Sequence, residues 1–386
     1  MYNNPLPYTT APRIYGFKKG HNPQDITGIL REILMKGHRW TDIDAVIFSG
    51  DILAAFDNTK HQLIHQANKD NNKPPKTRLA TMKDYYDKTG TITINNEHTT
   101  DPFNLNSGGT TGGIRTPAEF NNGMDYITRP VINKWLVNKT GFWLNNKEIN
   151  HAFWVDNLFQ TARNPTEMQT MIDDIINALF INGYEWKPGS VQIITTRNFN
   201  NDDTSLYTWV ENEFTPIPLV QSTNLLGEEI DNKGNSLTSQ QQRQTQAEKV
   251  FWANYRTMKK PGNKIATKIK AWLGSSAISA TFGSETWAIT KTALSKARTW
   301  ELGFLRKVIK FKFYDTKADY YQHSANHIDK IRHTAQLPHI FQLLLDSTFR
   351  AAHRQQNFKD AQGRNIINEL RTFRDRRWFD TVKNEH

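Results

Sequence analysis

The sequence predicts an α+β protein in which an antiparallel sheet is followed by a basic helical part. Residues 45–48 (Ala-Val-Ile-Phe) form a continuous apolar run, which is typical of a buried strand. Residues 151–160 hold two short apolar runs that meet at a tight turn, which predicts a β-hairpin. Elsewhere, apolar residues recur at helical spacing behind Asn-Pro pairs that begin helices. A chain of 386 residues can bury several cores, so we expect more than one domain.

The remaining elements follow from caps, prolines and periodicity. Asn or Asp can cap a first helical turn, and proline fits the first helical position. Up to residue 106 we expect a helix from Asn22-Pro23, the strand ending at Gly50-Asp51, a helix capped by Asp57, an exposed connection or insertion at 68–90, and a strand at 91–94 with a turn at Asn95-Asn96. Beyond it we expect a glycine-rich loop at 107–113, a helix from Thr116-Pro117 kinked or ended at Pro130, the hairpin, a helix from Asn164-Pro165 to Asn182-Gly183, and a strand at 191–194.

The predicted hairpin has an acid at its tip. We place its turn at Asp156-Asn157, because both residue types tolerate the positive φ that a two-residue turn requires. The apolar arms hold this carboxylate near a core, where it needs a cation or a donor as partner. The alternative is an exposed turn aspartate without a role.

Charge is distributed unevenly along the chain. Residues 1–232 hold 21 basic and 26 acidic side chains, a net charge of −5, whereas residues 233–386 hold 28 and 12, a net charge of +16. This split suggests that the second part binds a polyanion and that the first part uses carboxylates. The alternative is a soluble basic helical domain. Lys260, Lys264 and Lys268 are spaced as one cationic helical stripe.

The basic tail and the histidines allow more than one interpretation. Arg374, Arg376 and Arg377 lie among aromatic residues, so the tail either stacks on nucleic acid or forms a terminal amphipathic helix. His61 and His65 have the spacing of helical metal ligands but lack the glutamate of a zinc hydrolase, which favours a structural role.

Composition excludes several classes of protein. The sequence has no cysteine, which rules out disulfides, thiol catalysis and cysteine-ligated zinc, and fits a reducing compartment. No apolar run has the length of a membrane span, and the first residues lack the apolar region of a signal peptide. We therefore expect an intracellular protein, with the nucleus favoured, and no membrane partner.

Two acids are candidates for chemistry. Asp51 closes the buried strand, and Asp156 lies at the hairpin of the same predicted sheet. Carboxylates at the ends of adjacent strands can bridge divalent cations, an arrangement that serves phosphoryl transfer. The spacing alone is weak support, because many α+β domains offer such pairs.

Several motifs resemble those of reverse transcriptases of the non-LTR retrotransposon type. Asp51 to Asp57, with Ala55-Phe56-Asp57, is similar to the first palm motif of that family, and Trp154-Val155-Asp156-Asn157 resembles its aromatic-x-Asp-Asp hairpin. The other matching segments are Tyr15 to Gly20 (Gly-Phe-basic), Thr111 to Pro117 (Gly-Gly…Thr-Pro), Leu225 to Gly227 (primer grip), Gly283 to Trp287 (thumb) and Arg374 to Trp378. The matches cover nearly the whole chain, in the family's order.

The resemblance implies a right-hand polymerase with fingers, a ferredoxin-like palm and a helical thumb. It implies an RNA-directed DNA polymerase that uses two-metal nucleotidyl transfer on an RNA template and a DNA primer or target. The implied ranges are fingers at 1–43 and 68–106, palm at 44–67 and 107–232, a basic thumb at 233–315, and a helical nucleic-acid-binding extension at 316–386.

The resemblance also implies roles for individual residues. Asp51, Asp156 and Asn157 would be catalytic and bind Mg²⁺, with Mn²⁺ as an alternative. Phe56 would lie under the incoming sugar and exclude a ribose 2′-hydroxyl, or else be an ordinary core residue. Contacts to the deoxynucleoside triphosphate would come from Phe56, Gly112, Gly113, Thr116 and Pro117. Contacts to nucleic acid would come from Lys18, Lys19, Lys260, Lys264, Lys268, Arg374, Arg376 and Arg377.

Three departures from the family pattern leave the activity open. Asn157 stands where a second Asp is common, Thr110-Thr111 stand where Arg-Gln is usual, and Ser190 falls on a lysine position for which Lys187 could substitute. An amide brings no charge, so metal affinity should fall. The alternative function is therefore a catalytically impaired, polymerase-shaped protein that serves as a nucleic-acid-binding or structural assembly subunit.

Overall fold

The computed structural model describes residues 14, 16–17, 21–39, 44–86, 88–95, 98–109, 113–144, 147–196, 205–287, 291–309, 311 and 316–356. These residues divide into two units, one reaching Thr223 and the other beginning at Asn224. The first unit combines a sheet with helices, and the second is mostly helical. The prediction of a mixed α+β protein is confirmed. The assignment of ranges to fingers, palm and thumb stays a prediction.

The first unit is built on a five-stranded sheet with the strand order β13-β10-β1-β9-β8. Its central strand, β1, pairs antiparallel with β9 on one side and with β10 on the other, and β8 and β9 form the predicted hairpin. Only β13 runs parallel to its neighbour, β10. The strands are β1 (Val46–Asp51), β8 (His151–Trp154), β9 (Asn157–Ala162), β10 (Gln192–Thr195) and β13 (Leu219–Val220).

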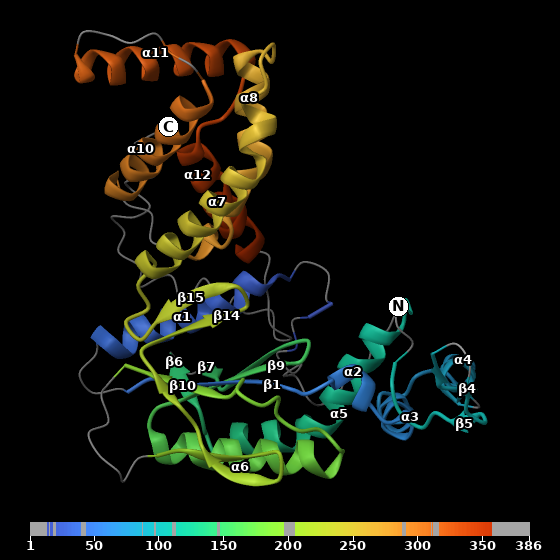
Figure 1. The fold of residues 1–386 in the computed structure, drawn as a ribbon. Helices are drawn as coiled ribbons and strands as arrows, with labels where there is room; N and C mark the ends of the chain where they lie inside the picture. Colours follow the sequence, from blue (N-terminus) through green and yellow to red (C-terminus); the bar gives the residue numbers. More distant parts are fainter. Residues whose placement is uncertain are drawn as a thin grey trace. The chain divides into compact units, whose positions relative to one another are not determined.

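Helices cover both faces of this sheet. Figure 1 shows α6 (Pro165–Ile181) along one face, beside α5 (Thr116–Val137), and α1 (Pro23–Arg39) across the other. The predicted caps of α1 and α6 are confirmed: the Asn22 side chain accepts a hydrogen bond from the Asp25 backbone N–H at 3.1 Å, and Asn164 accepts one from Glu167 at 2.8 Å. Two-sided cover explains why β1 begins with consecutive buried apolar residues, Val46 to Phe48, rather than with an alternating pattern.

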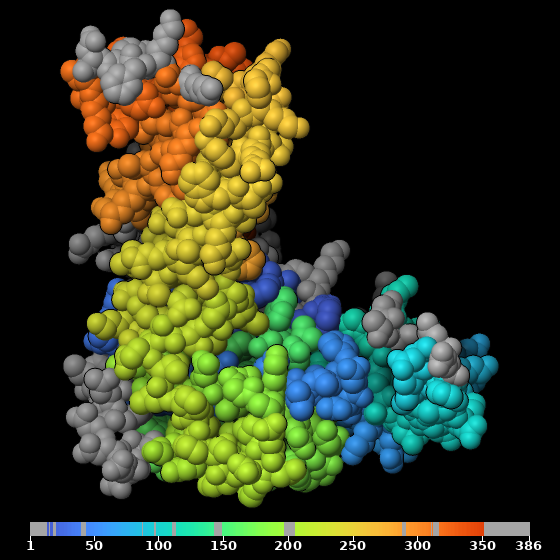
Figure 2. Space-filling view, in the orientation of Figure 1, coloured from blue at the N-terminus to red at the C-terminus, as the bar shows by residue number. Residues whose placement is uncertain are grey.

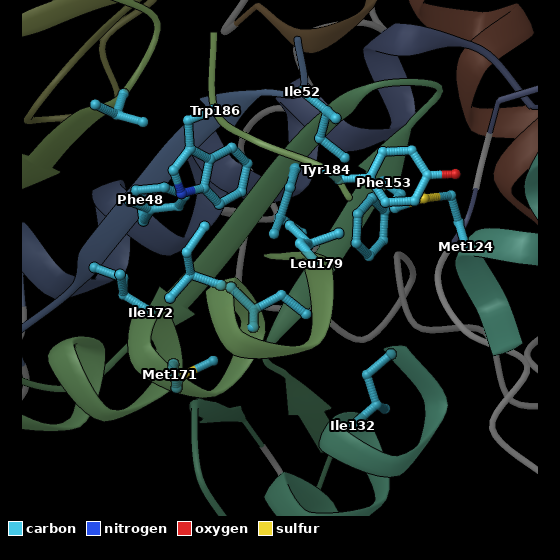
Figure 3. Packing of buried hydrophobic residues seen from close by; sticks show 14 of the residues in the cluster. Phe48, Ile52, Met124, Ile132, Phe153, Met171, Ile172, Leu179, Tyr184 and Trp186 are labelled. Carbon is cyan, nitrogen blue, oxygen red and sulfur yellow. The ribbon is translucent and has the colours of Figure 1, made fainter. Parts of the chain in front are cut away.

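The main core lies between the sheet and the α5–α6 layer. Figure 3 shows Phe48 from β1 beside Trp186, and their ring centroids are 5.3 Å apart. Met171 and Ile172 of α6 are fully buried in the same cluster. The indole N–H of Trp186 donates to the Thr208 hydroxyl, so this large side chain is buried without losing its hydrogen bond. The core therefore holds β1, and with it Asp51, in a fixed place.

Three local predictions for this unit are wrong or incomplete. The helix expected from Asp57 is two helices, α2 (Ala55–Asn58) and α3 (His61–Asp70), and Ala54 rather than Asp57 occupies the cap position. The exposed connection or insertion expected at 68–90 contains a helix that was not expected, α4 (Pro75–Tyr85), which Pro75 opens. Helix α5 continues through Pro130, whose ring the helix accommodates without ending.

The segment from α4 to residue 106 forms a separate lobe of the first unit. Two short antiparallel ladders, β2 with β5 and β3 with β4, follow α4. Figure 2 shows this lobe in cyan at the edge of the unit. The predicted strand at 91–94 is confirmed in part, as β3, and Asn95 adopts a positive φ of 52° after it. The strands are β2 (Thr89–Gly90), β3 (Thr93–Ile94), β4 (His98–Thr99) and β5 (Phe103–Asn104).

Two further hairpins complete the first unit. They are formed by β6 (Phe142–Leu144) with β7 (Lys147–Ile149), and by β11 (Tyr207–Val210) with β12 (Glu213–Pro216).

The second unit packs its helices around its own apolar cluster, which includes Phe251, Trp272 and Leu305. Hairpin β14–β15 (Ser222–Leu225, Glu228–Asp231) precedes α7 (Leu237–Met258). The later helical segments are α8 (Ile265–Trp272), a π-helical turn (Leu273–Ala277), α9 (Ile278–Thr281), a 3₁₀ turn (Ser284–Thr286), α10 (Lys291–Val308), α11 (Lys317–Ala335) and α12 (Ile340–Gln356). Across the described residues, none of the helices has the length and apolarity to cross a membrane.

The cationic helical stripe predicted in this unit is wrong. Lys260 lies in the connection between α7 and α8, and Lys264 occupies the N-cap position of α8 without a side-chain cap hydrogen bond. Only Lys268 is inside a helix, and its ammonium group donates to the Val308 carbonyl. The reason is Pro261-Gly262, with Gly262 at a φ of 87°, which interrupts the helical spacing.

Candidate functional site

The structure brings Asp51 and Asp156 together at one end of the sheet. Asp51 is the last residue of β1, and its Cα partner on β9 is Asn157. The backbone N–H of Ile52 donates to the Asp156 carbonyl at 2.9 Å, so the hairpin turn is tied to the end of β1. The juxtaposition of the two acids on adjacent strands is as predicted, while their roles stay predictions.

The hairpin turn lies one residue earlier than predicted. Trp154 pairs with Asn157, so the turn residues are Val155 and Asp156, and Asn157 is the first residue of β9. Val155 adopts a φ of 58°, which is uncommon for any side chain and strained for a β-branched one. The pairing of Asn157 with Asp51 fixes this register. Asp156 therefore lies in the turn and not at a paired position of a strand.

The backbone of Gly16 packs directly against the hairpin turn. Ile14 bridges Phe153 on the outer side of β8, and a Cβ placed on Gly16 would lie 2.7 Å from the Val155 backbone nitrogen. The Asn121 side chain donates to the Gly16 carbonyl at 2.8 Å, which ties the same backbone to α5. Only glycine fits at this approach, so the Gly-Phe segment noted in the sequence is a backbone support for the acidic turn.

Asp51 is held by a short loop from residues 187–190. The Lys187 ammonium group lies 3.3 Å from Asp51 Oδ2, with the lysine side chain 57% exposed and that of Asp51 24% exposed. The Lys187 backbone N–H also donates to the Asp51 carbonyl, and Ser190 Oγ accepts from the Asp51 N–H. The other carboxylate oxygen, Oδ1, is buried and has no hydrogen-bond partner among the described residues. One oxygen of Asp51 is therefore neutralised and the other lacks a donor.

The Asp156 carboxyl lies in a less favourable electrostatic environment. Burial raises its pKa above the ordinary aspartate value, and the negative charge of Asp51 raises it further. Its own backbone N–H, Lys187 and the Asn157 side chain act in the opposite direction; Asn157 Nδ2 lies 3.3 Å from Asp156 Oδ1. A carboxylate whose ionisation is opposed by burial and by a neighbouring negative charge is one that a divalent cation would stabilise.

The donor set fits a hard cation such as Mg²⁺ or Mn²⁺. Asp51, Asp156 and Asn157 offer only oxygen ligands besides the amide nitrogen, and the Oδ1 of Asp51 is a buried acceptor without a donor. In the part of the chain that is described, no three His, Cys, Asp or Glu side chains form a metal-holding group. The amide of Asn157 would therefore have to supply the third oxygen, as the sequence predicts.

Phe56 lies directly after this site, on α2. Its ring centroid is 4.5 Å from that of Phe120 on α5 and 6.1 Å, edge to face, from that of Phe17. Phe56 is partly buried and packs against the core, and its contact with a sugar stays a prediction. The three rings form one aromatic cluster that joins the Gly16–Phe17 segment to the helices.

The start of the glycine-rich loop is fastened beside Phe56. The Gly109 backbone N–H donates to the Phe56 carbonyl at 3.0 Å, and the Gly108 N–H donates to that of Thr59. His61 Nε2 lies 3.0 Å from the Gly108 carbonyl, which gives this histidine a structural role. Thus the loop that resembles the nucleotide-contacting motif begins next to the aromatic cluster.

The predicted nucleotide contacts are placed in part. Thr116 and Pro117 form the first turn of α5, where the Thr116 N–H donates to the Gly113 carbonyl at 3.2 Å. The buried Glu119 of the same turn pairs with Lys73 at 3.2 Å, which packs the α4 lobe against the helix start. Gly112, with Thr110 and Thr111, lies outside the described residues.

The predicted nucleic-acid contacts receive little structural description. Lys260 and Lys264 are exposed in the second unit, and Lys268 is partly buried. The other five predicted residues lie outside the described part of the chain: Lys18, Lys19, Arg374, Arg376 and Arg377.

Solved telomerase structures are similar to this chain at low sequence identity. No protein-family model matches the sequence, and no curated protein matches it. Apo telomerase from Candida tropicalis is a similar solved structure, with 11% identity, a TM-score of 0.45, and coverage of 93% of this chain and 57% of that chain. Telomerase from Candida albicans with the TWJ fragment of telomeric RNA has 9% identity and a TM-score of 0.37, with coverage of 94% of this chain and 55% of that chain. The Candida tropicalis enzyme with that fragment has 11% identity and a TM-score of 0.40, with coverage of 90% of this chain and 52% of that chain. The chain thus spans little more than half of the length of those chains.

Proposed function

We propose that the first unit is the catalytic part of an RNA-directed DNA polymerase of the non-LTR retrotransposon type. The observation that carries the proposal is the pair Asp51 and Asp156, held at the ends of adjacent strands by backbone hydrogen bonds. The aromatic cluster at Phe56 and the anchored start of the glycine-rich loop add a ring and a flexible loop next to the acids. This combination fits metal-assisted phosphoryl transfer with a nucleotide as substrate.

Asp51, Asp156 and Asn157 would hold Mg²⁺ or Mn²⁺. The bound cations would lower the pKa of the attacking hydroxyl and neutralise charge on the departing pyrophosphate. The protein's own residues orient the carboxylates: Ser190 fixes the backbone of Asp51, and Gly16 packs against the turn that carries Asp156. Lys187 supplies a cation beside Asp51, and its exposed ammonium group is free to turn toward a phosphate.

Substrates and partners follow from the same proposal. We infer deoxynucleoside triphosphates as small-molecule substrates, selected by the Phe56 ring, and an RNA template with a DNA primer or target as macromolecular partners. The basic second part supplies cations for the phosphates. Activity in the nucleus is part of this proposal.

A second candidate function is a polymerase-shaped nucleic-acid-binding or assembly subunit without catalysis. The observation that favours it is the ion pair of Lys187 with Asp51, together with an amide at Asn157. A carboxylate held by a lysine is already neutralised and has less need of a cation.

Primer extension separates the two candidates. Purified protein is incubated with an RNA template, a DNA primer and deoxynucleoside triphosphates, with Mg²⁺ or Mn²⁺. The polymerase proposal predicts extension that Asp51→Asn reduces on the order of a thousandfold, several kcal/mol of transition-state stabilisation. Asp173→Asn, on the exposed side of α6, is the matched control and should keep full activity. Salt-sensitive binding of the RNA–DNA duplex, with no extension in either metal, would establish the second candidate instead.

A further inference from the structure

The second unit contains a cavity of about 130 Å³ among α7, α9, α10 and α12. Its walls include small and apolar residues such as Ala297, which is 8% exposed. An engineered cavity of about 150 Å³ holds one benzene ring, so this space has the size of a single six-membered ring and is small for a purine. All the residues that line the cavity belong to the second unit, whereas the acidic site belongs to the first unit.

The polar lining distinguishes the cavity from a dry apolar void. Trp287 and Trp300 both line the cavity, and their indole rings can pack against a planar ligand. Gln240 and Gln244 of α7 add amides that can both donate and accept.

A cation lies at the rim. Lys296 lines the cavity from α10 and is exposed, so its ammonium group is available to an anionic group outside the ring pocket. A six-membered ring with carbonyl acceptors, amide-complementary edges and an attached anion has the chemistry of a pyrimidine nucleotide. The alanine walls suit the faces of such a ring, and the lysine suits its phosphate.

We propose that this cavity binds the base of a pyrimidine nucleotide, with its phosphate against Lys296. The nucleotide is either free or an unstacked residue of a nucleic-acid strand. The inference does not depend on catalysis at Asp51 and Asp156, because it concerns binding to the second unit alone.

Calorimetric titration of the full chain tests the proposal with UMP, CMP, uridine, AMP, oligo(U) and an oligonucleotide with abasic sites. We expect saturable binding of UMP or CMP, no binding of AMP at the same site, and weaker binding of uridine. Ala297→Leu should fill the cavity and abolish UMP binding, while Ala253→Leu, at an exposed position of α7, should not. Lys296→Gln should weaken UMP about tenfold, the value of one charge-assisted hydrogen bond, without affecting uridine.

A second variant covers the case in which Ala297→Leu does not fold. Gln244→Leu keeps the helix and removes one amide, and should weaken UMP about tenfold, whereas Gln246→Leu on the exposed side of α7 is its control. If only oligo(U) binds in a way that Ala297→Leu or Gln244→Leu weakens, a strand is the source of the base. Equal binding of AMP and UMP, binding that neither cavity variant changes, or no binding of any pyrimidine ligand would overturn the proposal. Primer extension is not part of the readout, so failure here leaves the polymerase proposal standing.

Discussion

The two units each contain a carboxylate paired with a cation, and the two pairs differ in their access to water. In the second unit, Glu301 and Arg332 form an ion pair with side chains 0% and 1% exposed. In the first unit, Asp51 and Lys187 form a pair with the lysine 57% exposed and one aspartate oxygen lacking a donor. A fully desolvated pair cannot exchange its partner without leaving a buried charge, whereas an exposed lysine can leave at little cost. The Glu301–Arg332 pair is therefore structural, and the Asp51–Lys187 pair is exchangeable.

Breaking the buried pair should have the largest effect. Arg332 also donates to the Pro338 carbonyl, and Glu301 accepts from the Ile340 N–H at 3.2 Å, so the pair joins α10, α11 and the start of α12. Arg332→Met should lower the free energy of unfolding by about 3–5 kcal/mol, measured by urea denaturation. The double variant Arg332→Met/Glu301→Gln should recover much of that loss. Equal destabilisation in the single and double variants would show that Glu301 is not the charge left unpaired.

A smaller effect is expected where glycine supports the acidic turn. Gly16→Ala places a methyl group against the backbone of Val155, where the nearest atom would be 2.7 Å away. We expect a loss of about 1–3 kcal/mol by overpacking and faster amide hydrogen exchange at residues 153–158. Gly274→Ala is the matched control, because a Cβ there meets nothing within 4 Å. Unchanged exchange in the hairpin would show that the turn does not depend on Gly16.

Removing the exchangeable cation should alter stability little and metal affinity more. Lys187→Gln should lower the free energy of unfolding by less than about 1 kcal/mol, since the lysine is largely exposed. It should also strengthen Mn²⁺ binding, because Lys187 and the metal compete for Asp51. Thermal unfolding measured at increasing Mn²⁺ concentrations gives both the stability and the Mn²⁺ affinity of the variant. Weaker binding of Mn²⁺ in this variant would contradict competition and favour a supporting role for the lysine.

The smallest expected effect concerns the pH dependence of stability. The pKa of Asp156 is raised in the folded protein, chiefly by burial, so its contribution to stability is full below the ordinary aspartate pKa and falls as the pH rises through the raised value. Asp156→Asn should therefore raise the free energy of unfolding of the metal-free protein at pH 7 by about 0.5 kcal/mol, a value that allows for solvent screening. It should make no difference near pH 3. Unfolding curves at both pH values check the sign. Destabilisation at pH 7 would mean that the ionised carboxylate is favoured by its surroundings.

The sequence predicts what depends on local chemistry and misses what depends on pairing. The caps Asn22 and Asn164, the strand of β1 and the hairpin arms are read correctly, because cap side chains and apolar runs act within a few residues. The turn is displaced by one residue, since the pairing of Asn157 with Asp51 forces a positive φ on Val155. Neither the contact of Gly16 with Val155 nor the Lys187–Asp51 pair has a local signal. A glycine before an aromatic residue and a lysine near the expected family position were the available hints.

Binding of Mn²⁺ to the acidic site tests the central claim most directly. Electron paramagnetic resonance titration of free Mn²⁺ would compare the wild-type chain with Asp51→Asn/Asp156→Asn and with the control Asp173→Asn. The claim that Asp51 and Asp156 form a divalent-cation site for nucleotidyl transfer predicts saturable binding in the wild-type chain and the control, lost in the double variant. Equal binding in all three proteins would contradict the claim. The absence of binding in both the wild-type chain and the Lys187→Gln variant would also contradict it.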